Sequence, residues 1–114
     1  MNQQHEKWLA QMRKGFIELC VLTALKQKGS CYGLELLQLF EHAELSVNEG
    51  TLYPLLNRMQ KNNLLTSYWE PPKDTGHPRR FYKLSAEGEN ALPLMLESYN
   101  HNHAALAQLQ VLSS

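Results

Sequence analysis

The chain has 114 residues, which suits one small domain, and 43% of them are hydrophobic, which is enough to build a core. Eleven Lys and Arg balance eleven Asp and Glu, so the protein is not uniformly basic. No apolar run reaches the roughly 18 residues that indicate a membrane-spanning helix. The first residues lack the pattern of a secretion signal, and two cysteines are too few for a disulfide framework, so we expect a cytoplasmic protein with reduced thiols.

The charges are unevenly distributed along the chain. Residues 29–51 carry four Glu and no Lys or Arg, whereas residues 52–83 carry six Lys or Arg against one Glu and one Asp. A local basic segment of this kind can bind phosphate groups although the protein as a whole is neutral.

Residues 6–28 are predicted to form one long helix, or two short helices that meet at Gly15, because apolar residues recur there at helical spacing. Residues 16–25 are apolar on nearly every side and should be central to the core. Gly29 follows two lysines and is a typical position for the end of this helix.

A second helix is expected from about Cys31 to His42, with Leu34, Leu37 and Phe40 directed inward. The polar residues that follow it separate it from a third helix. Two short helices joined by a tight connection are typical of a helix-turn-helix.

The start of the third helix has two alternatives. Ser46 and Glu49 fit a capping box, in which each side chain satisfies the other's free backbone amide. Pro54 is unfavourable inside a helix and favours a kink or a later start at Asn48. In either case the apolar stripe consists of Leu52, Leu55, Leu56 and Met59, and Asn62-Asn63 ends the helix.

After this helix the pattern predicts a β-hairpin, or wing. Residues 64–69 and 80–84 are rich in aromatic side chains and predict strands, and residues 71–78 form a loop of Pro, Gly and polar residues. Ser85 should cap a final helix that ends at about Leu112. Its apolar stripe is Leu92, Met95, Leu96, Tyr99, Leu106 and Leu109.

The predicted fold is therefore mainly α with a small β-hairpin. Residues 1–84 should form a winged helix-turn-helix DNA-binding domain, whose first helix also contributes to a dimer. Residues 85–114 should form a long C-terminal dimerisation helix, because its apolar stripe needs a partner and the first helix carries a matching surplus at Trp8, Leu9 and Met12. The alternative is that this helix packs within its own chain, which would leave a monomer.

The order of motifs resembles the PadR family of transcriptional repressors. The resemblance covers roughly residues 12–90, and the short ending resembles the subfamily that includes a lactococcal multidrug-responsive repressor. It rests on Lys14-Gly15-Phe16-Ile17-Glu18-Leu19, on Tyr32-Gly33, on Glu49 to Met59 with its Thr51-Leu52-Tyr53-Pro54 core, and on Arg79 to Gly88. The family carries a proline at this point of the recognition helix, so the resemblance supports a helix that includes Pro54.

A helix that enters the major groove reads bases with the side chains of its exposed leading face, and a basic wing contacts phosphate. The predicted DNA-binding residues are Tyr32, Asn48, Glu49, Thr51, Tyr53, Arg58, Lys73, His77, Arg79 and Arg80. For Asn48 and Glu49 the alternative is a purely capping role, and for Tyr32 and Tyr53 it is packing. The expected DNA is double-stranded and near-palindromic, read by a homodimer.

The resemblance also implies a small aromatic or phenolic effector that binds at the dimer centre and releases the DNA. The residues expected there are Trp8, Met12, Gly15, Leu19, Leu96 and Tyr99. Tyr99 stands where the lactococcal relative has a tryptophan, which weakens a multidrug interpretation. Core packing is the alternative for each of these residues.

Two other classes of function are alternatives to DNA binding. The chain shows no catalytic motif, and we expect neither an enzyme nor a cofactor or metal. Metal sensing through His5, His101, His103 and a cysteine is a minor alternative. The neutral charge and the acidic second helix favour instead a winged helix for protein–protein contact without DNA binding.

Overall fold

The computed structural model describes residues 2–72 and 76–113. Four helices and three short strands follow one another in the order α1 (Gln3–Lys28), β1 (Cys31–Tyr32), α2 (Gly33–His42), α3 (Glu49–Lys61), β2 (Leu65–Glu70), β3 (Arg79–Leu84) and α4 (Ala86–Gln110). This is the expected mainly helical fold with a β-hairpin, and α1 is one continuous helix. None of the helices in these ranges combines the length and the apolarity needed to cross a membrane.

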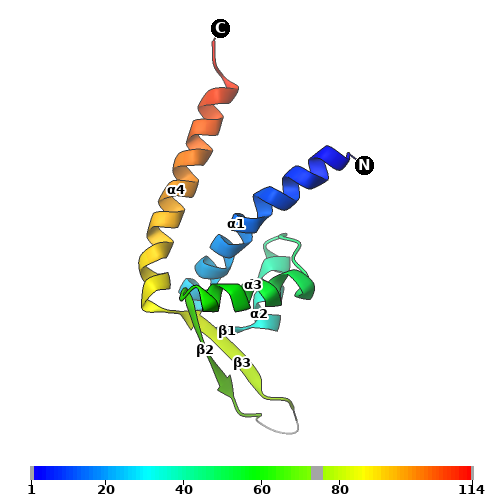
Figure 1. Ribbon diagram of the computed structural model, residues 1–114, viewed down its shortest axis with the longest axis vertical. Coiled ribbons are helices and arrows are strands. Elements are labelled where there is room, and N and C mark those ends of the chain that lie inside the picture. Colours follow the sequence, from blue (N-terminus) through cyan, green and yellow to red (C-terminus); the bar gives the residue numbers. More distant parts are fainter. Residues whose placement is uncertain (1, 73–75, 114) are drawn as a thin grey trace.

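The molecule is elongated, with principal extents of 65 × 36 × 24 Å. α2, α3 and the sheet gather around the second half of α1, and the β2–β3 hairpin projects from this body at one end (Figure 1). The first half of α1 and most of α4 extend from the other end as two diverging arms (Figure 1). The hairpin and the arms are therefore available for different contacts.

One hydrophobic core joins all four helices to the sheet. α3 contributes the whole predicted stripe, and α1 contributes the segment that is apolar on nearly every side. The buried residues are Ile17, Leu19, Val21, Leu22, Leu25, Cys31, Leu36, Phe40, Leu52, Leu55, Leu56, Met59, Leu65, Tyr82 and Leu92. Beyond Leu92, every residue of the α4 stripe is only partly buried or exposed in the single chain.

The caps explain where most helices begin and end. Gly29 ends α1 with a φ of 86°, a backbone conformation that glycine adopts readily. Ser85 caps α4, since its hydroxyl accepts a hydrogen bond from the Gly88 amide at 2.9 Å. Both assignments agree with the sequence prediction.

The start of the second helix was predicted wrongly. Cys31 and Tyr32 form the short strand β1, which pairs antiparallel with Tyr82 and Phe81 of β3, so that the sheet has the order β1-β3-β2. α2 therefore begins two residues later than expected. Its inward face also differs in part from the prediction, although Leu37 packs against the core as expected. Leu36 is fully buried and Leu34 is 48% exposed, while Phe40 is buried as predicted.

The capping box at Ser46 is also wrong, and the later start is confirmed. Asn48 is the residue that caps α3, since its side-chain oxygen accepts from the Thr51 amide at 2.9 Å. The carbonyl of Ser46 instead accepts a hydrogen bond from the Arg13 guanidinium of α1. α3 continues through Pro54 as a single helix of 13 residues.

Candidate nucleic-acid interface

The outward face of α3 can be derived from the positions of its buried residues, Leu52, Leu55, Leu56 and Met59. Successive residues of an α-helix are about 100° apart, so the residues opposite the stripe are Gly50, Pro54, Asn57 and Lys61, with Tyr53 and Arg58 beside them. All six are exposed. Asn57 and Lys61 were not among the predicted DNA-binding residues, although projecting the stripe onto a helical wheel would have found them.

Tyr53 lies against the start of α2. A Cβ atom at Gly33 would stand 2.5 Å from the Tyr53 hydroxyl and from a carbon of its ring, so only glycine leaves room for this ring. Tyr53 remains 40% exposed. Its pKa is raised, first by partial burial and then by the nearby Glu49 carboxylate. The ring therefore packs on α2, as one alternative proposed, and part of the residue remains accessible to solvent.

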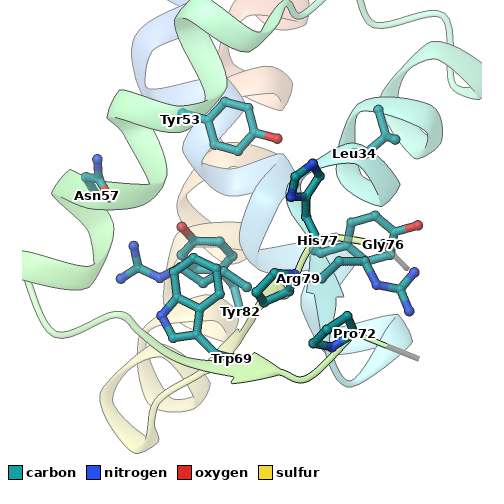
Figure 2. A pocket seen from close by; sticks show the side chains of 13 residues that line it. Leu34, Tyr53, Asn57, Trp69, Pro72, Gly76, His77, Arg79 and Tyr82 are labelled. Carbon is teal, nitrogen blue, oxygen red and sulfur yellow. The ribbon is translucent and has the colours of Figure 1, made fainter. Parts of the chain in front are cut away.

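A hollow of about 890 Å³ separates α3 from the hairpin. Figure 2 shows Tyr53 and Asn57 on the α3 side of it, and Trp69, His77 and Arg79 on the hairpin side. Trp69 is 64% exposed. The predicted residues Tyr32, Tyr53, His77, Arg79 and Arg80 all line this hollow.

Arg79 stands at the outer end of β3. Its guanidinium lies 4.8 Å from the centre of the Tyr32 ring and donates to the Glu70 carboxylate at 3.3 Å. The two side chains of this ion pair are 42% and 32% exposed, so the pair is weak and open to water. Tyr32 also packs edge-on against Phe81 at 5.2 Å. Tyr32 thus supports the Arg79 side chain.

Arg80 is held more firmly than its neighbour. It donates to the Gln60 side chain of α3 at 2.7 Å and to the Ser67 hydroxyl of β2 at 3.1 Å. Its guanidinium lies 5.2 Å from the centre of the buried Tyr82 ring. Arg80 therefore connects the hairpin to the last turn of α3.

The remaining predicted DNA-binding residues are dispersed. Asn48, Thr51 and Arg58 line a second groove of about 400 Å³ between α3 and α1, which also contains Arg13 and Lys14. Glu49 is exposed in the first turn of α3. Lys73 lies outside the described residues.

Five of the six candidate effector residues line two neighbouring hollows. Met12, Gly15, Leu19 and Tyr99 line a hollow of about 460 Å³ between α1 and α4. Leu96 lines an adjoining hollow of about 450 Å³, to which Leu19 and Tyr99 also contribute.

The two aromatic residues among the candidate effector residues, Trp8 and Tyr99, have different surroundings. Trp8 lies outside both hollows, stacked beside His5 at 6.3 Å, and is 56% exposed. The Tyr99 ring lies between Phe16, at 5.8 Å, and His103, at 6.1 Å. Tyr99 is thus already packed against two rings of its own chain.

The alternative of metal sensing finds no geometric support in the part of the chain that the structure describes. No three His, Cys, Asp or Glu side chains gather there as a ligand set would. Cys20 and Cys31 are free thiols, and burial raises the pKa of both.

Comparison with known proteins adds the family. The model of the transcriptional regulator PadR-like family matches residues 21–93. A PadR-like transcription factor from Bacteroides fragilis is 35% identical, with a TM-score of 0.77 over 90% of this chain and 98% of that one. A PadR-like regulator from Bacillus cereus is 32% identical, with a TM-score of 0.75 over 90% and 99%.

A third solved structure, a Streptococcus transcriptional regulator, is 31% identical, with a TM-score of 0.78 over 88% of this chain and 97% of that one. A search of curated proteins found no match. The family match, these structures and the winged helix with its α3–hairpin face agree. The chain belongs to the PadR-like family of transcriptional regulators.

Proposed function

We propose that the protein is a sequence-specific DNA-binding repressor that acts in the cytoplasm as a homodimer and is released by a small aromatic or phenolic compound. The observation that carries the proposal is the shared face of α3 and the hairpin. Tyr53 and Asn57 of α3 and Arg79 and Arg80 of β3 line one hollow, at the end of the molecule away from the two arms.

The contacts divide into two groups. The leading residues of α3, from Asn48 to Tyr53, would enter the major groove, where the Thr51 and Tyr53 hydroxyls reach bases or phosphates. Tyr32, Arg58, His77 and the hairpin cations Arg79 and Lys73 would bind the phosphate backbone and position the helix. The neutral net charge does not oppose this, because phosphate binding depends on the local field.

The two arms support a dimer. Apolar side chains remain exposed on them: Trp8, Met12, Leu94, Leu106, Leu109, Val111 and Leu112. Removing such an apolar surface from water would be energetically favourable. A two-fold arrangement would do this by pairing α4 of one protomer with α1 of the other. The two α3 helices would then read half-sites about 34–36 Å apart.

The effector would bind between α1 and α4, where the hollows next to Tyr99 are lined mainly by apolar side chains. Their walls also border the surface that the proposed dimer covers. A flat aromatic compound bound there would change the packing between protomers and, through it, the spacing of the two α3 helices.

A gel-shift titration with the DNA upstream of the protein's own gene tests the proposal. Wild type should bind, and the affinity should fall steeply as salt rises. Arg79→Gln should weaken binding and flatten the salt slope by about 0.9 for each phosphate that the variant no longer neutralises. Lys7→Gln removes the same charge from the exposed first half of α1 and is the matched control. It should leave the affinity and the salt slope unchanged.

Two outcomes would count against it. Binding that is insensitive to salt would favour the alternative of a winged helix for protein contact. An unchanged salt slope in Arg79→Gln would remove the hairpin from the interface. Repeating the titration with phenolic acids and planar aromatic dyes tests release, which should appear as free DNA at rising compound concentration.

A further inference from the structure

The hairpin carries two adjacent arginines that the sequence cannot tell apart. In the structure the two arginine side chains have different kinds of hydrogen-bond partner. Arg79 is paired with an exposed carboxylate at the outer end of β3. Arg80 points to the junction between the hairpin and α3, where its partners are neutral side chains.

Three hydrogen bonds close a triangle at this junction. Arg80 donates from Nη2 to Gln60 Oε1 at 2.7 Å and from Nε to Ser67 Oγ at 3.1 Å, and the Ser67 hydroxyl donates to Gln60 Oε1 at 3.2 Å. The three residues come from β3, α3 and β2, respectively. All three side chains are partly buried. The triangle therefore joins both strands of the hairpin to the helix.

Aromatic rings hold the guanidinium in this place. The Tyr82 ring, only 3% exposed, lies 5.2 Å from it, and the Trp69 ring lies 6.0 Å from it. A planar guanidinium can stack on rings and donate two hydrogen bonds in fixed directions at once, which a lysine ammonium cannot do. The site therefore requires the shape of arginine and not only its charge.

We propose that Arg80 is a positioning residue, which sets the angle between hairpin and α3 through Gln60, and that it does not act as a phosphate contact. The proposal rests on the proposed function, because the angle matters only if both elements bind the same DNA. Arg79 is then the β3 arginine that binds phosphate, and Arg80 determines where that contact falls relative to the bases under α3.

Three variants are compared: Gln60→Leu, Arg80→Lys and the control Lys7→Gln, which lies on α1 away from the hairpin. Circular dichroism first establishes that each is folded at the assay temperature. Fluorescence anisotropy then gives the affinity for the DNA upstream of the protein's own gene and for a scrambled duplex of equal length, over a range of salt concentrations.

Gln60→Leu changes no charge, and Arg80→Lys preserves one. Each should nevertheless weaken binding to the upstream DNA by about tenfold, the effect of removing a hydrogen bond to a charged group. Binding to the scrambled duplex and the salt slope should stay as in wild type. The double variant should bind no more weakly than either single one, because both remove the same interaction. Lys7→Gln, which lies outside the proposed interface, should bind both duplexes as tightly as wild type.

If Gln60→Leu or Arg80→Lys binds the upstream DNA as tightly as wild type, the proposal is wrong. It is also wrong if both duplexes lose affinity equally, since that is the behaviour of a phosphate contact. Amide hydrogen exchange of residues 65–70 and 79–84 in the free protein tests the same junction without DNA. It should be faster in Gln60→Leu, and unchanged exchange would overturn the proposal. A wild-type protein that binds no DNA would instead refute the proposed function, while the exchange result would still decide whether the triangle exists.

Discussion

Gly88→Ala should destabilise the protein, although it replaces glycine by the best helix former inside a helix. Gly88 lies in the first turn of α4, where a Cβ atom would stand 2.2 Å from the backbone carbonyl oxygen of Leu64. Carbon and oxygen atoms in close contact are normally about 3.3–3.6 Å apart. Helix and loop must therefore separate by about 1 Å. The obstacle is backbone and cannot turn aside as a flexible side chain can.

The cost can be estimated from the bonds at this joint. Overpacking of a filled site costs about 1–3 kcal/mol. Separation also strains the hydrogen bonds of Ser85 to the carbonyls of Leu64, at 3.0 Å, and Asn63, at 2.5 Å, each worth about 1 kcal/mol. The gain in helix propensity, about 1 kcal/mol, is smaller. The net expectation is a loss of about 2 kcal/mol and a midpoint of thermal unfolding lower by roughly 8 °C.

The assay is thermal unfolding followed by circular dichroism at one fixed protein concentration, since a dimer's midpoint depends on concentration. Gly50→Ala is the control, because a Cβ there would meet only the Asn48 side chain at an ordinary 3.4 Å. That variant should unfold at the wild-type temperature or slightly above. If Gly88→Ala were as stable as Gly50→Ala, the close contact between α4 and Leu64 would be refuted.

Three further outcomes are expected. Gly33→Ala should displace the half-exposed Tyr53 ring. It should therefore weaken DNA binding while the unfolding midpoint stays within a few degrees of wild type. A normal affinity would mean that Tyr53 takes no part in DNA binding. Cys31, which is buried, and Cys20, which is partly buried, should react slowly with iodoacetamide at pH 8 and rapidly in guanidinium, because burial raises both pKa values and limits access. Fast labelling of Cys31 in the native protein would contradict its buried position. Leu106→Glu should shift the protein to monomer in sedimentation, because it charges the exposed α4 stripe, and an unchanged dimer would place the interface elsewhere.

Much of the fold could be predicted because its signals are local. A helix that ends at Gly29, a hydroxyl cap at Ser85 and a four-residue stripe on α3 depend on neighbours within one or two turns. The existence of the hairpin is also a local signal, since two segments rich in aromatic residues with a Pro- and Gly-containing loop between them predict two paired strands.

The errors occur where distant segments decide the structure. Two residues are too few to predict a strand, and β1 exists because Cys31 and Tyr32 pair with β3, about fifty positions later in the chain. Ser46 and Asn48 are equally good caps by residue type. In the structure, Arg13 of α1 donates a hydrogen bond to the Ser46 carbonyl, and Asn48 caps α3. No local motif predicts this contact between α1 and the segment before α3.

The candidate site follows the same division. Sequence identifies residue types on the helix and the hairpin, but a partner across the fold determines what each side chain is free to do. Arg79 and Arg80 are identical neighbours that alternate across a strand, so one reaches the outer edge and the other the junction with α3. Their different partners could not be deduced before the register of the hairpin and its contact with Gln60 were known.

Three close contacts join α3, directly or through its neighbours, to the rest of the winged helix. Gly33 admits the Tyr53 ring against α2, Gln60 holds the hairpin through Arg80, and Gly88 seats α4 on Leu64 just after α3 ends. These joints connect α3, the hairpin and α4 within one chain. If the protein is a dimer released by an effector, as proposed, an effector between α1 and α4 would control DNA binding by moving whole winged helices relative to each other, since closing or opening a single recognition site would require breaking one of the joints.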